Sequence, residues 1–568
     1  MSSSGLLEAR ARLVIIFLLG TLLIYTVAST SVLTISSSDL GLVSRLPITF
    51  WIGLGLLACL WYLSRSSQKY QIIGFIFTLL FLYFAPTIVR VPVWISESYY
   101  PFGESVLINS YGHLVTPTFA LDALGVEREF PLMSYHYWPL FLYLASSFTL
   151  LTGIPHSIIL KFFPLLTISL YGLLTFLILR SRLKASFAIF GAAWFLSSFF
   201  LRQHYFGPQG IAYIFFLLIV LIMSRLFFEK QTKRGTLTAL FLLLFVVITL
   251  THALTSLITL MVIIAAYLAQ RLHHNLSAGI TARLCLFSAV ILLSYNWFVA
   301  MDFFNRSVQT LSQFFLGRGE LRLYRETSRI VGSEAQRLNY VVSWSIVLLT
   351  VVIAATQMLY VLNRFRSRKQ RNKEEFSFFT AIWLILVFVF ALTAVYGSYE
   401  AYQRAFLFGL IPLTYLCISL LSRKPRLLLL ILGGLLFLNV EALYGADSYR
   451  LATEPVLAGT SFFVYNTPNN VSCLYNFYPH VRYFNPLKLV EFVSIPGTLP
   501  FTTFPNSSAV NGAVMRADYI IRSSLQHNYY VYFLREDPLD QVDFDRFNRV
   551  YDDESFRVFM HANKTSLP

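Results

Sequence analysis

Runs of about 20 mostly apolar residues, separated by short polar connections, recur from Leu13 to Tyr444. A helix of about 20 residues is long enough to cross the hydrocarbon core of a bilayer. The pattern predicts thirteen membrane-spanning helices. They lie at 13–35, 47–64, 70–89, 158–180, 185–201, 210–228, 235–251, 253–270, 281–301, 339–362, 377–396, 405–421 and 427–445.

One further apolar stretch, at 137–153, is too short for this pattern and is ended by Gly153 and Pro155. We expect a helix that lies at the membrane interface, with Tyr137 and Trp138 at the level of the headgroups. A true membrane span is the alternative, and it would invert the orientation of everything that follows.

Basic residues mark every second connection of the thirteen-helix count. Arg10 and Arg12 precede the first helix, and the largest basic cluster lies at 364–373. Because Lys and Arg are enriched in cytoplasmic loops, this pattern predicts a cytoplasmic N-terminus in a multi-pass protein of the cell membrane. The long connections 90–153 and 302–338 then face the outside, as does the C-terminal segment.

Hydrophobic periodicity falls to the level of a soluble domain after residue 445. The segments 513–523 and 547–560 alternate like half-buried strands, the second with a turn at Asp552–Asp553. We therefore expect an all-α polytopic membrane bundle over residues 1–445, including the two external loops. A small extracytoplasmic α/β domain follows at 446–568.

Composition narrows the function classes. The chain of 568 residues is 56% hydrophobic and only 13% charged, with a mean hydropathy of +0.63, whereas soluble domains carry about 25% charged residues. A soluble enzyme, a disordered protein, a collagen-like fibre and a disulfide scaffold are excluded. The net charge of +16 lies mostly in short loops between apolar runs, so we expect no nucleic-acid partner. The four cysteines show no metal-ligand spacing.

The candidate catalytic and binding residues lie at the predicted outer ends of the helices. A transporter coupled to protons or ions would have charged residues near the midpoints of its helices, and the sequence shows no such set. Glu97 and Glu104 follow the third helix and lead to His113. A carboxylate near the headgroups can take a proton from a hydroxyl group. The alternative is a pair of solvated loop acids. His136 begins the interfacial helix, where an aromatic belt is the simpler interpretation.

Three more outer clusters hold cations and amides. Arg404 has Glu400 four residues before it, which suits either a helical ion pair or an arginine oriented to bind a lipid phosphate. We assign Arg404, Arg202 and Glu400 to a donor phosphate site. The remaining polar residues, which could equally be satisfied structural groups, are assigned to a substrate pocket: His113, His136, His204, Gln209, His252 and Tyr402.

These features resemble the GT-C superfamily of polytopic membrane glycosyltransferases. The resemblance rests on Glu97 after an early helix, on Tyr-Gly-His-Leu at 111–114 and on His-Tyr-Trp-Pro-Leu at 136–140. The segments 206–209, 251–255 and 400–404 look like those of archaeal members.

The resemblance implies an enzyme that transfers a sugar from a polyprenyl (dolichyl-type) phosphate to a glycan, lipid or protein acceptor at the external leaflet. It places the catalytic carboxylate of the family on Glu97, as a general base in an inverting transfer. The sequence departs from the family in having Glu rather than Asp and in lacking D-x-D and Trp-Trp-Asp motifs. No cofactor is certain from the sequence. A divalent cation is possible but has no D-x-D motif to support it, so metal dependence and transfer of whole oligosaccharides are both in doubt.

Two other functions fit a helical bundle of this kind. One is a flippase or exporter of lipid-linked glycans, which would need a polar path through the bundle. The other is a non-catalytic scaffold subunit. An enzyme requires Glu97, His136, His252 and Arg404 to converge at one lipid-accessible site.

Overall fold

The structure, a computed structural model, describes most of the chain. The described residues are 3–30, 40–89, 96–114, 134–228, 234–272, 280–301, 303–305, 308–309, 312, 332–365, 375–393, 398–450, 452–475, 479–485, 488, 490–495 and 504–561.

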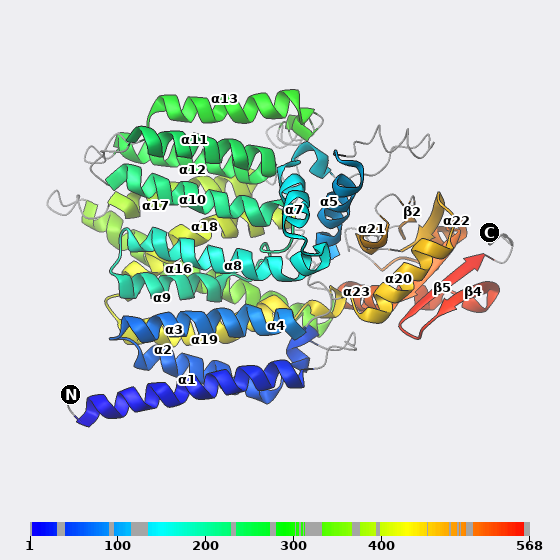
Figure 1. Cartoon of the computed structure of the whole chain (residues 1–568), viewed down its shortest axis with the longest axis horizontal. Coiled ribbons are helices and arrows are strands. Elements are labelled where there is room, and N and C mark those ends of the chain that lie inside the picture. Colours follow the sequence, from blue (N-terminus) through cyan, green and yellow to red (C-terminus); the bar gives the residue numbers. More distant parts are fainter. Residues whose placement is uncertain are drawn as a thin grey trace.

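Long helices run side by side and make up most of the molecule (Figure 1). Among the described residues, nine helices are long and apolar enough to cross a membrane, and five shorter apolar helices accompany them. One of the five, Leu140–Thr152, lies in the stretch expected at the interface. The other thirteen helices overlap the thirteen predicted spans. They are α1 (Ser3–Ser29), α2 (Ile48–Leu63), α3 (Gln68–Leu79) continued by α4 (Ala85–Val89), α8 (His156–Arg180), α9 (Ala185–Ser198), α10 (Pro208–Phe228), α11 (Arg234–Thr251), α12 (Ala253–Leu272), α13 (Ala282–Phe298), α16 (Glu334–Phe365), α17 (Glu375–Thr393), α18 (Ser398–Leu421) and α19 (Pro425–Tyr444).

Helix α9 lies at the centre of the bundle and is buried along nearly its whole length. Its small residues allow this, because a side chain at Gly191 would meet Leu179 of α8 at 2.4 Å. Such close approach is how membrane helices gain packing without a hydrophobic driving force. The helix ends at Ser198, and the loop that follows carries several of the candidate residues.

Two short helices, α5 (Tyr99–Tyr111) and α7 (Leu140–Thr152), lie against each other beside the C-terminal domain (Figure 1). The Ser146 hydroxyl of α7 hydrogen-bonds to Asn109 of α5. Helix α7 ends at Gly153, whose φ of +67° favours glycine. It does not run along the bundle, which agrees with the interfacial helix expected at 137–153. These elements mark one end of the bundle, termed the domain end.

The C-terminal domain is a mixed five-stranded sheet with strand order β2-β1-β3-β5-β4. Strands β1, β2 and β3 are parallel, and β5 is antiparallel to both β3 and β4. The elements are α20 (Glu454–Asn466), β1 (Val471–Leu474), α21 (Pro479–Phe484), β2 (Val490–Val493), α22 (Ser507–Arg516), β3 (Tyr519–Ser523), α23 (Ser524–Leu534), β4 (Phe547–Asp552) and β5 (Phe556–His561).

Of the two segments predicted to form strands, one does so over its whole length and the other only in part. The hairpin at 547–560 is confirmed as β4 and β5. The prediction at 513–523 is correct only for β3, because residues 513–516 belong to α22. That helix starts at Asn506, whose side chain accepts a hydrogen bond from the Ala509 amide, and it buries Val510, Ala513 and Val514. The spacing of these buried residues is helical, and the capping residue outweighs the short alternation in the sequence.

Aromatic side chains join the domain to the bundle. Tyr449, in the turn after α19, packs on Tyr532 and Phe533 of α23 with ring centroids 4.5 and 5.0 Å apart. The carbonyl of Tyr532 accepts a 3.0 Å hydrogen bond from the amide of Ser333, next to the start of α16. Contacts with both α16 and α19 therefore hold the domain at this end of the bundle.

Candidate functional site

The loop between α9 and α10 is anchored at the domain end by Arg202. Its guanidinium is buried, and it donates hydrogen bonds to the carbonyls of Leu443 and Ala442 at 2.6 and 3.0 Å. The last carbonyls of α19 have no partner within their own helix, so this contact satisfies them. The backbone of Arg202 adopts φ = 59°. The structure thus uses this predicted phosphate ligand to cap α19.

The next residue of the loop reaches a different helix. Gln203 accepts a 2.7 Å hydrogen bond from Nη1 of Arg404, near the start of α18. Both side chains are half-buried. This contact holds the guanidinium in place against the loop. The Glu400 side chain, expected to orient Arg404, lies outside the described residues.

His252 lies beside this pair and is the single residue that connects α11 to α12. The Nδ1 atom accepts a 3.2 Å hydrogen bond from the Thr255 amide and is 2.9 Å from the Thr255 hydroxyl. Burial, and then the nearby Arg404 guanidinium, lower the pKa of His252 to about 3. The ring is therefore neutral near pH 7. With Nδ1 accepting, its proton is on Nε2, which can donate a hydrogen bond.

The turn that carries His136 packs against the same connection between α11 and α12. Trp138 is buried against Ala253, the residue after His252. The hydroxyl of Tyr295 donates a 2.6 Å hydrogen bond to the carbonyl of Tyr137 and so fixes the turn on α13. The ring of His136 lies against that of Tyr137, tilted by 42° with ring centroids 3.9 Å apart. Arg404, His252 and the turn of His136 thus lie in one neighbourhood.

His204, in the same loop as Gln203, and Gln209, just after that loop, are fully buried. Gln209 is in the first turn of α10, and neither atom of its side-chain amide has a hydrogen-bond partner in the described part of the chain. A buried amide without partners carries an energetic penalty of about 1–3 kcal/mol. His204 packs edge-on against Tyr83, at 5.4 Å between ring centroids. His204 is thus placed inside the bundle, where a role in packing accounts for it.

The predicted carboxylates of the first long loop separate from each other. Glu97 is exposed in a single turn at 96–98, whereas Glu104 is buried in α5. The turn of Glu97 and helix α5 both contact α21 of the C-terminal domain. The Glu97 charge also raises the pKa of Tyr529 in α23, after burial as the larger cause. Glu97 therefore lies at the junction of bundle and domain.

The candidates form two groups at the domain end. Arg404, Gln203 and His252 make the first, termed the arginine site, and Glu97 belongs to the second. A continuous buried cluster connects their surroundings, because it contains both Tyr99, two residues from Glu97, and Phe206, three residues from Gln203. Of the remaining predicted residues, Tyr402 is half-buried on α18 and His113 is exposed after α5.

Two residues of these groups were not predicted as site residues. Gln203 lies between Arg202 and His204, so the sequence indicates a polar segment at this place. It does not indicate that Gln203 binds Arg404. Tyr529 has no local signal at all, because it belongs to an ordinary amphipathic stretch of the C-terminal domain.

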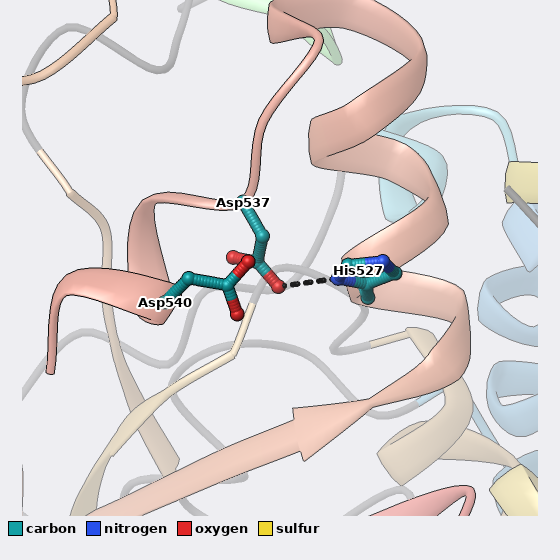
Figure 2. Close-up of side chains that lie close together, drawn as sticks. All are labelled: His527, Asp537 and Asp540. Carbon is teal, nitrogen blue, oxygen red and sulfur yellow. Dashed lines mark hydrogen bonds and ion pairs between the residues drawn. The ribbon is translucent and has the colours of Figure 1, made fainter. Parts of the chain in front are cut away.

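A third cluster, in the C-terminal domain, has the composition of a metal site. His527, Asp537 and Asp540 point toward one another (Figure 2). Asp537 accepts a 2.9 Å hydrogen bond from the His527 ring and another from the Leu539 amide. Asp540 pairs with Arg522. The hydrogen bond to Asp537 raises the pKa of His527. These contacts account for the arrangement, because Asp537 caps the short turn 538–541 and ties it to α23 through His527.

Comparison with known proteins gives structural likenesses only. No family model matches the sequence, and no curated protein is significantly similar to it. The chain is similar to the archaeal oligosaccharyltransferase AglB from Archaeoglobus fulgidus in complex with an inhibitory peptide and a dolichol-phosphate. The identity is 12%, with 84% of this chain and 72% of that chain covered and a TM-score of 0.48.

It is also similar to ArnT from Cupriavidus metallidurans bound to undecaprenyl phosphate. There the identity is 11%, with 88% of this chain and 99% of that chain covered and a TM-score of 0.48. Both likenesses concern the fold alone. At such identities and scores, neither likeness assigns a role to any residue of this chain.

Proposed function

We propose that the protein is a membrane glycosyltransferase that takes a sugar from a polyprenyl phosphate and transfers it to a hydroxyl or amide acceptor at the domain end. The observation that carries this proposal is the arginine site. Three segments far apart in the chain bring a half-buried guanidinium, an amide and a neutral imidazole together. Such donors suit a phosphate whose lipid tail stays in the membrane.

The arginine site offers the charge that transfer from a lipid phosphate requires. The leaving group departs as a phosphate anion, so the protein must stabilise negative charge more than it must supply a proton. Arg404 supplies positive charge, and the Nε2 hydrogen of His252 supplies a neutral donor. Because His252 stays uncharged near pH 7, it can donate a hydrogen bond without repelling Arg404.

Glu97 provides the base in this proposal. It removes the proton from the acceptor group, whose oxygen or nitrogen then bonds to the anomeric carbon. The bond between that carbon and the phosphate oxygen breaks, and its electron pair leaves with the polyprenyl phosphate. A single direct displacement of this kind inverts the anomeric centre. Exposure of Glu97 at the junction leaves it open to an acceptor from the aqueous side.

The domain end faces the outside of the cell in this proposal, because the basic connections of the sequence lie at the other end. Thirteen alternating helices then place the N-terminus in the cytoplasm and the C-terminal domain outside. The acceptor is an extracytoplasmic glycan, lipid or protein.

Purified protein in liposomes that contain dolichyl phosphate mannose or dolichyl phosphate glucose tests this function. Release of dolichyl phosphate is scored alongside movement of the intact lipid between leaflets. An enzyme releases dolichyl phosphate, with water accepting the sugar when no better acceptor is present. A flippase moves the intact donor without releasing it, and a scaffold subunit does neither. Either of these results would overturn the proposal.

A further inference from the structure

Part of the C-terminal domain packs on the bundle and part of it faces water. On the packed part, the ring of His480 in α21 lies 5.2 Å from the ring of Tyr99 in α5. Helix α22 instead contacts strand β1 and the turn 538–541, which both belong to the domain. Asn470, directly before β1, and Asn506, directly before α22, are exposed.

Both asparagines open the sequence N-x-[ST], the acceptor sequence of N-linked glycosylation. Residues 470–472 read Asn-Val-Ser, and residues 506–508 read Asn-Ser-Ser. Such a triplet is common by chance, so the sequence alone does not assign a glycan to either asparagine. The structure adds the local geometry of each site.

Asn470 lies in the turn between α20 and β1, with φ = 61°. Among residues other than glycine, asparagine is one of the few that adopt this left-handed backbone readily. The serine at the third position of the triplet is Ser472, whose hydroxyl donates a 3.0 Å hydrogen bond to the carbonyl of Arg516, the last residue of α22. Asn470 therefore lies near the end of α22, whereas Asn506 lies at its start.

Asn506 is the N-terminal cap of α22. Its side-chain oxygen accepts a 2.8 Å hydrogen bond from the Ala509 amide, and this contact does not use the side-chain nitrogen. A glycan is attached through that nitrogen, so the oxygen remains a carbonyl oxygen and the cap survives the modification. Both asparagines can thus carry a bulky group without loss of the contacts that shape the domain.

We propose that Asn470 and Asn506 are N-glycosylation sites, modified by an oligosaccharyltransferase that uses a lipid-linked glycan. The side-chain nitrogen bonds to the anomeric carbon of the glycan and releases one proton to a base of that enzyme. The bond between the anomeric carbon and the donor phosphate breaks, and its electron pair leaves with the phosphate. This inference goes beyond the proposed function, because here the chain is an acceptor. The two share only the outward position of the domain.

A further N-x-[ST] triplet supplies an internal control. It opens at Asn275, between the end of α12 at Leu272 and the start of α13 at Ala282. Helix α12 begins next to His252 at the domain end, so its other end lies on the opposite side of the bundle. An enzyme that acts only on the outer side cannot reach Asn275 if the domain faces outward.

The experiment counts glycans site by site. The full chain is produced in a eukaryotic host, whose own oligosaccharyltransferase acts in the lumen of the endoplasmic reticulum, and its peptides are analysed by mass spectrometry. We expect glycans at Asn470 and Asn506 and none at Asn275. Asn470→Asp and Asn506→Asp should each lose the glycan at the changed site and keep the other.

Aspartate is chosen because it tolerates the left-handed backbone and caps a helix as well as asparagine does. A change at Ser472 would instead break its hydrogen bond to Arg516. Asn469→Asp is the matched control, since Asn469 is exposed in the same turn but lacks a hydroxyl residue two positions later. It should keep both glycans. Equal thermal unfolding midpoints after enzymatic removal of the glycans show that a lost glycan does not come from misfolding.

The outcomes separate this inference from the proposed function. If Asn470, Asn506 and Asn275 all lack glycans, the inference is wrong, while release of dolichyl phosphate in liposomes still tests the enzyme. A glycan at Asn275 alone would show that the domain faces the cytoplasm, which overturns both the inference and the proposed orientation. A glycan at only one of the two domain sites overturns the assignment of the other.

Discussion

Nη1 of Arg404 donates a 2.7 Å hydrogen bond to Oε1 of Gln203, and the two residues are 201 positions apart in the chain. The contact joins the start of α18 to the loop between α9 and α10. Arg202 attaches the same loop to the end of α19. An amide in this position orients the guanidinium at the domain end. The first prediction tests whether the guanidinium binds a phosphate there.

Arg404→Lys should weaken binding of dolichyl phosphate by about tenfold or more, because an ammonium group cannot make the two-pronged contact of a guanidinium. Binding is measured on the purified protein with dolichyl phosphate alone, so that no sugar need be known. Arg337→Lys is the matched control, since Arg337 is half-exposed near the start of α16 and pairs with Glu334. Equal affinities for all three proteins would exclude Arg404 as the phosphate ligand.

Glu97→Gln should reduce release of dolichyl phosphate by about 10²–10⁴-fold, the usual contribution of a general base. The amide has the same size but cannot take a proton. Binding of dolichyl phosphate should stay at the wild-type level, because Glu97 is proposed to act on the acceptor and not on the phosphate. Glu334→Gln, an exposed acid at the same end, serves as the control. A Glu97→Gln protein with wild-type turnover would show that another group is the base.

Arg202→Gly separates a structural from a ligand role for Arg202. Glycine relieves the left-handed backbone at φ = 59°, so any loss of stability comes from the guanidinium. Two buried carbonyls of α19 lose their partner, which should lower the free energy of unfolding by about 2–4 kcal/mol. Thermal unfolding in detergent measures it. A variant as stable as the wild type but with weak dolichyl phosphate binding would restore Arg202 as a phosphate ligand.

His480 should make the attachment of the C-terminal domain sensitive to acid. Burial lowers its folded pKa from 6.5 to about 3. Above pH 6.5, His480 is neutral in both the folded and the unfolded protein, so it does not change the free energy of unfolding. As the pH falls from 6.5 toward 3, the unfolded state takes up a proton that the folded state does not, so stability falls, by about 2 kcal/mol near pH 5.

His480→Phe keeps a ring between the domain and Tyr99 but removes the titrating group. The unfolding midpoint of this variant should therefore drop less than that of the wild type between about pH 7 and pH 5. His561→Phe is the comparison, because His561 is half-buried at the end of β5. Parallel curves for the wild type and His480→Phe would show that another group controls acid stability.

The sequence by itself determined the membrane bundle. The length of an apolar run and the residues that end it are local properties, and each predicted span coincides with a helix. The short helix ended by Gly153 and the hairpin at 547–560 were predicted for the same reason. The failure at 513–516 is also instructive, since four alternating residues carry less information than the cap at Asn506 and the helical spacing after it.

Only the tertiary structure decided which polar side chains meet. Arg202 and Arg404 look equivalent in the sequence, as basic residues at helix ends, yet one caps α19 across 241 positions and the other is oriented by Gln203. Glu97 and Glu104, seven residues apart, differ because one lies in an exposed turn and the other on the buried face of α5. Tyr529 lies in the C-terminal domain, yet the charge of Glu97 raises its pKa. Hydrophobic pattern fixes where a helix lies relative to the membrane, but the partner of a polar group depends on which helices pack together.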